Sequence, residues 1–370
     1  MDEKQNDIFT IAVIAGILMA FVTFDLLYWF GVFTDKPVLD TIRKPILTTR
    51  GVANGTFFED YEAYVKARFY NGTKWEKTVR SAEFFFGKRE YNEVYVGKKA
   101  TLFERHLTEE YEGTPVEKSL DYLEELVTRY HANVILVPTS DSIWRDRLPL
   151  YADVFQQEKY LTQAKERIGD EYYIGLYDIL TAHAKEKLYY EADPHWTSLA
   201  AYYAYEEWWR HTGERVYYSY DLANKKVVTE GFVGPLIQRS GSELRKESIF
   251  ILEETLKKPV QVTYDNQVML KDFYRPEYLN TENAYGYFLG DGFGFAQIDT
   301  GRDQTKTLFV IGDSYANCMI PLLAPYYKTI YLYQSKDYKG DAEKLFSEYC
   351  KDNTDVLVLE SVTGLLDQFR

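Results

Sequence analysis

The last third of the chain alternates between short apolar runs and helical patterns, and this alternation constrains the fold more than any other feature. Apolar runs at residues 308–311, 329–333 and 355–360 are separated by segments whose apolar residues recur at helical spacing. Strands joined through helices lie parallel in one sheet, and the helices cover its faces. The sequence therefore predicts an α/β fold around a parallel central sheet.

Further elements precede this unit. In chain order, they are a helix at 116–130, a strand at 133–138, a helical segment at 144–168, a helix at 199–209 and strands at 248–252 and 260–264. Residues 212–305 form a less regular insertion that ends in a glycine-rich loop at 285–301. The chain of 370 residues is long enough to bury one large core.

Residues Ile8–Phe33 form a long apolar stretch that is interrupted only by Asp25. As a helix, the stretch would exceed the roughly 30 Å hydrocarbon core of a bilayer. Because it lacks the short core and cleavage site of a removable signal peptide, we expect an uncleaved signal-anchor. The predicted division is a tail at 1–7, a transmembrane helix at 8–33, a tether at 34–56 and a large domain at 57–370.

The charges that flank this stretch bear on its orientation. Lys4 is the only cation before it, whereas Lys36, Arg43 and Lys44 follow it. Counted literally, the positive-inside rule places the large domain in the cytoplasm. Asp25 indicates either a contact with a partner helix or a position near enough to the interface to be hydrated.

Ser314 follows the strand at 308–311, where a helical pattern begins. Functional groups gather at the carboxyl ends of parallel strands, and the free N–H groups of a helix start stabilise developing negative charge. Ser314 is therefore placed as a nucleophile on a strand-to-helix turn. The alternative is that its hydroxyl only caps the helix.

Asp193 and His195 are separated by a single proline. At this spacing the carboxylate can approach Nδ1 of the imidazole, fix its tautomer and stabilise the imidazolium. Taken alone, the segment equally suits a helix cap and a buried, hydrogen-bonded histidine. Three other histidines in charged surroundings, expected to be exposed, are His106, His183 and His211.

Composition excludes several classes of function. The net charge is −14, and no basic stripe is present that could neutralise the phosphates of a nucleic acid. The two cysteines form neither a disulfide framework nor a metal-ligand spacing, so neither a catalytic metal nor a cofactor is expected. Aromatic residues make up 17% of the chain, which suits either a carbohydrate-facing groove or an aromatic-rich core.

The two motifs together resemble those of the DHHW family in the SGNH-hydrolase superfamily, whose members include alginate O-acetylation proteins of the AlgX/AlgJ type. The residues that carry the resemblance are Asp193-Pro194-His195-Trp196-Thr197, Ala200, Ala201, Tyr205 and Gly312-Asp313-Ser314-Tyr315. The similarity runs from about residue 95 to the C-terminus. Pro194 stands where the family name has a second histidine, so that position is not expected to be essential.

The resemblance implies an SGNH-hydrolase-like three-layer sandwich with Ser314 as nucleophile, His195 as base and Asp193 as orienting carboxylate. It also implies a single-pass protein of the cell membrane whose large domain is extracytoplasmic. This orientation is opposite to the one that the flanking charges predict. The implied activity is transfer of an acetyl group to hydroxyls of a cell-surface polysaccharide. A multi-span membrane acyltransferase would deliver the acetyl group, and Asp25 offers a place to dock on it.

An acyl transfer of this kind needs two hydrogen-bond donors for its oxyanion. The Ser314 backbone N–H is the expected first donor. The candidates for the second donor or for contact with substrate are Gly290, Gly292, Asn317, Tyr315 and Trp196. The two glycines equally suit a simple turn.

Two other functions remain open at this point. An acetylesterase uses the same three residues and differs only in its acceptor, which is water. A non-catalytic glycan-binding scaffold would use Ser314 only as a cap.

Overall fold

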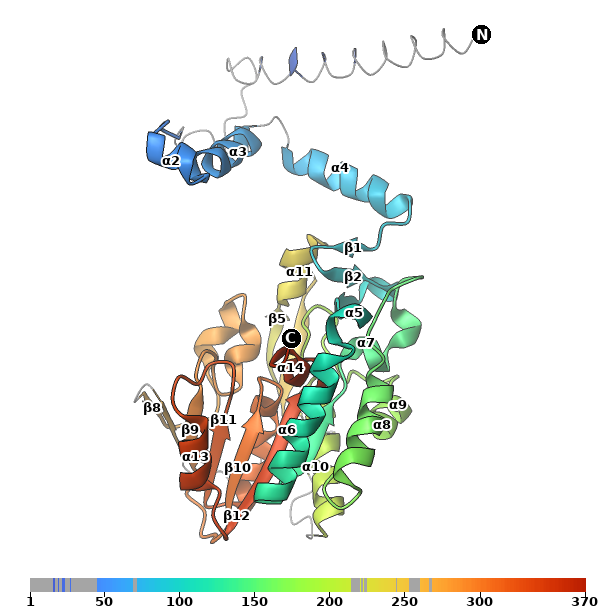
Figure 1. The fold of residues 1–370 in the computed structure, drawn as a ribbon. Helices are drawn as coiled ribbons and strands as arrows, with labels where there is room; N and C mark the ends of the chain where they lie inside the picture. The colour runs from blue at the N-terminus through green and yellow to red at the C-terminus, as the bar shows by residue number, and fades with distance from the viewer. Residues whose placement is uncertain are drawn as a thin grey trace. The chain divides into compact units, whose positions relative to one another are not determined.

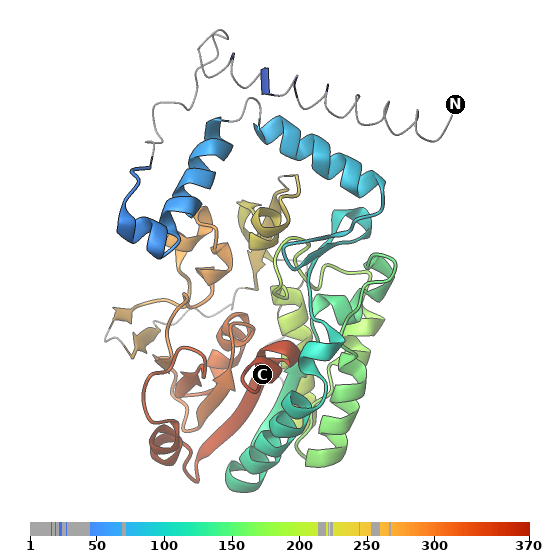
Figure 2. The same ribbon diagram turned by 45° about the horizontal axis from the view of Figure 1, so that its top comes forward.

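The computed structural model describes residues 16, 19, 22, 23, 27, 45–68, 72–213, 220, 222, 225–243, 245–252, 260–265 and 268–370. The chain divides into two compact units, Met1–Lys88 and Arg89–Arg370 (Figures 1 and 2). Most of the predicted membrane span at 8–33 lies outside the described residues, as does the first part of the tether. Within the described ranges, no helix is long and apolar enough to cross a membrane.

The described part of the first unit is helical. It contains α2 (Thr49–Ala53), α3 (Thr56–Arg68) and α4 (Gly72–Phe85). The Thr48 hydroxyl accepts a hydrogen bond from the Gly51 N–H at 3.0 Å and so caps the start of α2.

The second unit is built on a seven-stranded sheet with the order β4-β12-β10-β11-β9-β7-β8. The strands are β4 (Asn133–Val137), β12 (Thr354–Ser361), β10 (Thr307–Gly312), β11 (Thr329–Tyr333), β9 (Phe295–Asp299), β7 (Gln261–Tyr264) and β8 (Met269–Leu270). The first four run parallel, as predicted, but the remaining three are antiparallel. The prediction of a parallel sheet is therefore wrong for one side, and the sheet is mixed.

The antiparallel side comes from the segment that the sequence marked as an irregular insertion. β9 lies within the expected glycine-rich loop and pairs with β11, with Ala296 opposite Leu332. Ala296 and Ile298 are buried, whereas the residues between and beside them are half-buried. This alternation is typical of a strand. The sequence did not predict β9 because the alternating run is short and glycines precede it.

Each face of the sheet has its own apolar core, which makes three layers. Phe309 and Val358 point to one face, where they pack with residues of α6 (Thr114–Tyr130), α8 (Gln157–Ile168), α13 (Ala342–Tyr349) and α14 (Val362–Asp367). Figure 1 shows α6 crossing this face. Leu308 and Leu359 point to the other face, where α10 (Ser198–Thr212) contributes its aromatic residues. Because adjacent residues of a strand face opposite sides of the sheet, β10 and β12 contribute side chains to the apolar cores on both faces.

The helical segment predicted at 144–168 is interrupted. The structure has α7 (Ser140–Ile143), a 3₁₀ turn at Arg145–Arg147, and then no helix until α8 begins at Gln157. Pro149 lacks the N–H that a helix interior needs, and Tyr151 has a positive φ of 64°. Together they interrupt the helical pattern.

Smaller elements complete the second unit. They are β1 (Glu90–Tyr91), β2 (Val94–Val96), β3 (Leu102–Glu104), α5 (Thr108–Tyr111), α9 (Tyr177–Ala182), β5 (Lys226–Phe232), α11 (Pro235–Ser240), β6 (Glu247–Ile251) and α12 (Ile320–Leu323). β1–β3 form one antiparallel sheet, and β5 and β6 form another.

Candidate active site

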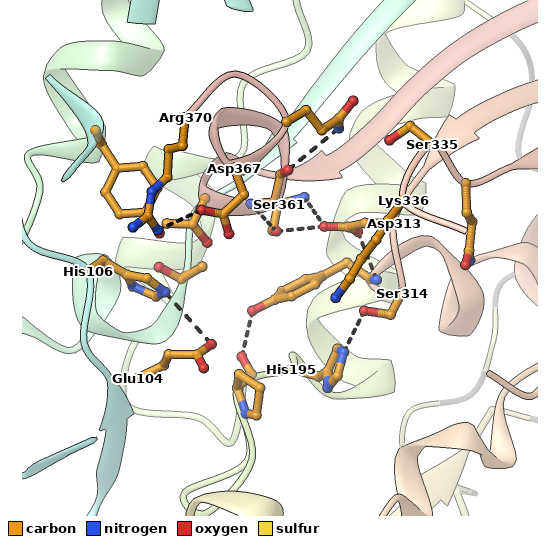
Figure 3. Close-up of a pocket in the computed structure, with 18 of the residues that line it drawn as sticks. Glu104, His106, His195, Asp313, Ser314, Ser335, Lys336, Ser361, Asp367 and Arg370 are labelled. Atoms are coloured by element: carbon orange, nitrogen blue, oxygen red, sulfur yellow. Dashed lines mark hydrogen bonds and ion pairs between the residues drawn. The ribbon is translucent and has the colours of Figure 1, made fainter. Parts of the chain in front are cut away.

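Ser314, His195 and Asp193 form a chain of hydrogen bonds at the carboxyl end of β10. Figure 3 shows the contact between His195 and Ser314. Ser314 Oγ lies 2.7 Å from His195 Nε2, and His195 Nδ1 lies 2.7 Å from Asp193 Oδ1. A carboxylate can only accept at Nδ1, so in the neutral ring Nε2 is left unprotonated and accepts the serine hydroxyl proton. The contact predicted between Ser314 and His195 is present, although 119 residues separate them. Their catalytic role remains a prediction.

A tight turn presents Asp193 and His195. Tyr189 and Trp196 form an antiparallel bridge at its base, and the Thr197 N–H donates to Leu188 O at 2.8 Å. Asp193 Oδ1 also accepts the backbone N–H of His195 at 2.9 Å. One carboxylate oxygen therefore holds both the main chain and the ring of His195, which is the local side-chain bonding that aspartate favours in turns.

Glu247 on β6 holds the start of this turn. Its carboxylate accepts hydrogen bonds from the N–H groups of Glu191 and Ala192, each at 3.0 Å. It also forms an ion pair with Lys187 at 3.0 Å. Burial raises the pKa of Glu247, and Lys187 and the N–H donors act against that rise. Glu247 is a positioning residue that sequence reasoning missed, because no motif links it to a turn 55 residues away.

Asp313 braces the turn that carries the nucleophile. It is half-buried, and its two oxygens accept the N–H of Tyr315 at 2.9 Å and the N–H and hydroxyl of Ser361 at 2.9 and 2.6 Å. Burial raises the pKa of Asp313, whereas these hydrogen bonds favour its charged form. The carboxylate ties the end of β10 to the end of β12, so the position of Ser314 is set by two neighbouring strands.

The helix predicted after Ser314 is not continuous. The chain forms a 3₁₀ turn at Ala316–Cys318, the four-residue α12, and a second 3₁₀ turn at Ala324–Tyr326. Pro321 and Pro325 each lack an N–H and prevent a continuous helix. A helix start therefore does not explain how charge at Ser314 is stabilised. The Ser314 N–H itself has no acceptor among the described residues, so it can donate to a substrate.

A hydrogen bond joins Asn317 to Gly290. The Asn317 side chain is buried, donates to Gly290 O at 3.4 Å and accepts from Gln334 Nε2 at 2.9 Å. The Gly290 N–H donates to Gly286 O at 2.9 Å. Gly292 has a positive φ of 71°, as expected of a glycine in a turn. The loop is thus anchored to the nucleophile turn, and the Gly290 N–H is already used within it.

Tyr315 and Trp196 connect the two halves of the site. The Tyr315 hydroxyl donates to Pro194 O at 2.5 Å, and Trp196 Nε1 donates to Tyr315 O at 2.9 Å. Trp196 is completely buried, and the Tyr315 N–H is taken by Asp313. Both side chains therefore fix the base-bearing turn against the nucleophile turn. Only Tyr315 also lines the open cleft described next.

Ser314 and His195 open into a cleft of about 1010 Å³. Its charged lining residues include Glu93, Glu104, Arg105, Glu110, Arg239, Asp291, Lys336, Asp337, Asp367 and Arg370. The three arginines are engaged by carboxylates, for example Arg105 with Glu90 at 2.8 Å. Lys336 is exposed and has no carboxylate partner in the described part of the chain. Figure 3 shows Lys336 extending toward Ser314.

His106 also lines this cleft, and the expectation that it is exposed is wrong. It is only 5% exposed, with Nδ1 3.3 Å from Asp141 Oδ2 and Nε2 3.8 Å from Glu104 Oε2. Burial alone would lower the pKa of His106, but the two carboxylates outweigh it and raise the pKa to about 10. An imidazolium with this pKa stays charged at neutral pH and therefore cannot act as a base. Its ion pairs with Glu104 on β3 and Asp141 on α7 instead join these two elements.

Glu360, next to Ser361 on β12, is completely buried. Its Oε2 accepts from Gln368 Nε2 at 2.8 Å, whereas Oε1 has no partner among the described residues. Burial, with a smaller contribution from the charge of Asp313, raises the pKa of Glu360 to about 8. The folded protein therefore holds a proton that the unfolded chain releases near its ordinary value of 4.5.

This proton gives a predicted pH dependence of stability. Because the folded state binds the extra proton, the free energy of unfolding should fall as pH rises from about 4.5 to 8, by at most about 1.4 kcal/mol per pH unit. Glu360→Gln should remove this slope and stabilise the protein at pH 8, as measured by urea denaturation across the range. Glu348→Gln, at an exposed position on α13, is the control and should keep the slope. Equal slopes in wild type and Glu360→Gln would contradict the assignment.

Among the described residues, no group of three histidine, cysteine or carboxylate side chains is arranged to hold a metal ion.

The comparisons with known proteins agree with the resemblance seen in the sequence. Residues 156–333 match the family described as DHHW protein, and this range includes Asp193, His195 and Ser314. No curated protein matches the chain. The resemblance to the DHHW family is therefore confirmed over this range.

Solved structures with the same fold include a DHHW family protein from Eubacterium siraeum, with 19% identity, a TM-score of 0.59, and coverage of 75% of this chain and 93% of that chain. PatB1 from Bacillus cereus has 16% identity, a TM-score of 0.56, and coverage of 75% and 99%. PatB1 is also known with a sulfonyl adduct. The O-acetyltransferase domain of Pseudomonas putida AlgJ matches less well, with 13% identity, a TM-score of 0.42, and coverage of 74% and 91%. The first two likenesses establish the fold over 75% of the chain.

Proposed function

From the match of residues 156–333 to the DHHW family, we propose that this chain is an O-acetyltransferase that acts on a polysaccharide through a covalent acetyl-serine. The observation that carries the proposal is the chain of hydrogen bonds from Ser314 through His195 to Asp193, which opens into a cleft of about 1010 Å³. Nucleophile, base and orienting carboxylate have the mutual distances that acyl transfer requires.

In the first half-reaction, Ser314 Oγ attacks the carbonyl carbon of the acetyl donor while His195 Nε2 takes the hydroxyl proton. Asp193 keeps the ring oriented and stabilises the imidazolium. The tetrahedral intermediate collapses, the bond to the donor breaks, and His195 returns the proton to the leaving group. Ser314 is left as an acetyl ester.

In the second half-reaction, a sugar hydroxyl takes the place of the donor. His195 removes its proton, the oxygen attacks the acetyl ester, and Ser314 Oγ leaves with the proton that His195 returns. The Ser314 N–H donates to the oxyanion in both halves, because it has no acceptor of its own among the described residues.

The lining of the cleft supports a polyhydroxylated acceptor. Hydrogen-bonding groups in its lining include Gln334 and Ser335, and Lys336 extends toward the nucleophile. The volume exceeds that of a single small substrate, so several sugar units can lie across Ser314. The many charged side chains in the lining also disfavour a lipid acyl chain as the acceptor.

The apolar stretch at 8–33 supports a cell-membrane location, with a multi-span acyltransferase as acetyl donor. An extracytoplasmic domain then requires acetyl groups to cross the membrane, and Asp25 offers a polar contact to that partner. The flanking charges favour the opposite orientation, so a C-terminal reporter must decide it.

The direct test is mass spectrometry of the intact protein after incubation with a chromogenic acetyl donor. We expect an acetyl adduct on Ser314 that is absent from Ser314→Ala and strongly reduced in His195→Ala. Adding an oligosaccharide acceptor should then discharge the adduct and yield acetylated sugar.

Other outcomes of this experiment separate the alternatives. Release of free acetate with no acetylated sugar identifies an acetylesterase. Absence of any adduct, together with no labelling of Ser314 by a serine-directed phosphonate, leaves a glycan-binding scaffold and overturns the proposal.

A further inference from the structure

Tyr285 lies flat against the ring of His195. The two ring centroids are 3.8 Å apart, and the planes differ by only 6°. Tyr285 is 2% exposed and lies on a 3₁₀ turn, Ala284–Tyr287, within the loop that the sequence marked only as glycine-rich. It does not line the cleft. The side chain therefore contacts the base but cannot contact a bound substrate.

The turn around Tyr285 is held from several sides. Tyr190 meets the Tyr285 ring edge-on at 6.2 Å, and Phe288 packs against it at 5.3 Å. The ring of Tyr278 packs so closely on Gly286 that a Cβ there would collide with it. Further along, Gly290 is bound by Asn317 of the nucleophile turn. The ring of Tyr285 is thus a fixed surface and not a mobile side chain.

The stack on Tyr285 restrains the tilt of the His195 ring, which the other neighbours of His195 do not restrain. Asp193 and Ser314 hold the ring at its two nitrogens, which lie in the ring plane. Those two contacts allow the ring to tilt about the line that joins them. Tyr315 approaches only at 5.2 Å and 45°. A face-to-face contact is the arrangement that suppresses the tilt.

We propose that Tyr285 is a positioning residue that fixes the plane of His195 and stabilises the imidazolium by a cation–π interaction, a role that rests on the proposed acyl transfer. The face of an aromatic ring carries partial negative charge. The charge on His195 appears only when it takes the proton from Ser314, so the attraction is stronger in the transition state than in the resting enzyme. An interaction that grows along the reaction raises kcat and leaves substrate binding unchanged.

The hydroxyl of Tyr285 has no part in this role. Burial raises the pKa of Tyr285 well above its ordinary value, so the group stays neutral and does not exchange protons with the site. Tyr285→Phe should therefore retain kcat within about twofold, whereas Tyr285→Leu should lose about tenfold in kcat with little change in KM.

Two further readouts separate the electronic effect from simple packing. Pentafluorophenylalanine at position 285 keeps the shape of the ring but reverses the charge of its face, and it should lower kcat as far as Tyr285→Leu does. The NMR signals of the His195 ring protons report the stack through the ring current. Their displacement should persist with Phe and vanish with Leu.

Tyr287→Leu is the matched control. Tyr287 lies two residues away in the same turn, is 6% exposed, and stacks on Tyr274 at 5.0 Å. Its removal costs a buried aromatic ring without altering the stack on His195, so the ring-proton signals and kcat should stay close to those of the wild type. A tenfold loss of kcat in this variant would show that any damage to the turn suffices, and would overturn the proposal.

The rate of labelling by a fluorophosphonate distinguishes failure of this proposal from failure of the proposed function. If Ser314 is labelled and Tyr285→Leu reacts as fast as the wild type, only the role of Tyr285 is wrong. Unchanged kcat with pentafluorophenylalanine removes the cation–π part. If no variant is labelled at all, the acyl-transfer function has failed, and the role assigned to Tyr285 fails with it.

Discussion

Asp193→Asn is expected to lower kcat for acetyl transfer by about 10⁴-fold, with little change in KM or in thermal stability. The amide group of asparagine would donate to His195 Nδ1, and the ring proton would move to Nε2. The ring could then no longer accept the proton of the Ser314 hydroxyl, which lies 2.7 Å from Nε2. Steady-state kinetics with a chromogenic donor measure the loss.

Asp291→Asn is the control for this substitution. Asp291 lines the same cleft, but its carboxylate accepts from Asn283 at 2.7 Å and does not contact His195. Asp291→Asn removes one negative charge from the site, as Asp193→Asn does, and should leave kcat within a few-fold of wild type. If Asp193→Asn kept more than a tenth of the wild-type kcat, His195 would not be oriented by this carboxylate.

The second large effect concerns Gly234, just before α11. A Cβ at this position would collide with the carbonyl of Ala192 and lie 2.8 Å from Asp193 N. The φ of Gly234 is −72°, so the backbone conformation suits any residue and only the close approach requires glycine. Gly234→Ala must push the turn that carries Asp193 and His195 away from Ser314.

A displacement of about 1 Å at a catalytic group costs about 10²-fold in rate, and we expect Gly234→Ala to lose kcat by that factor. The melting temperature should fall only modestly, because the strain is relieved by moving the turn. Gly231→Ala is the control, since a Cβ there would meet nothing closer than Thr229 Oγ1 at 3.6 Å. Equal kcat in both alanine variants would show that the turn tolerates the displacement.

Local patterns predicted the parallel half of the sheet well. The elements β10, β11, α13 and β12 follow one another with short connections, so hydrophobic periodicity and the rules of parallel connection suffice. The strand predicted at 260–264 is confirmed as β7, but β9 and the antiparallel pairing of both strands were missed, because that pairing is set by distant partners. Strand preference depends on such tertiary neighbours more than helix preference does.

The pairing of Ser314 with His195 was predictable because each lies in a short motif with its own chemical logic. The supporting residues were not. Glu247, Asp313 and Tyr285 act through contacts with the main chain or with a ring face, and such contacts leave no spacing in the sequence. His106 was misjudged for a related reason, since its burial depends on the fold of β1–β3 over α7.

The turn that carries Asp193 and His195 is secured to three separate elements. The Leu102 N–H donates to Glu191 O at 2.7 Å, the Leu236 N–H donates to Ala192 O at 3.1 Å, and Glu247 binds the turn from β6. These elements are far apart in the sequence, and contacts of that kind form slowly. A chain refolding from denaturant should therefore regain its helical circular dichroism before it regains any reactivity at Ser314. The appearance of that reactivity marks completion of the native state.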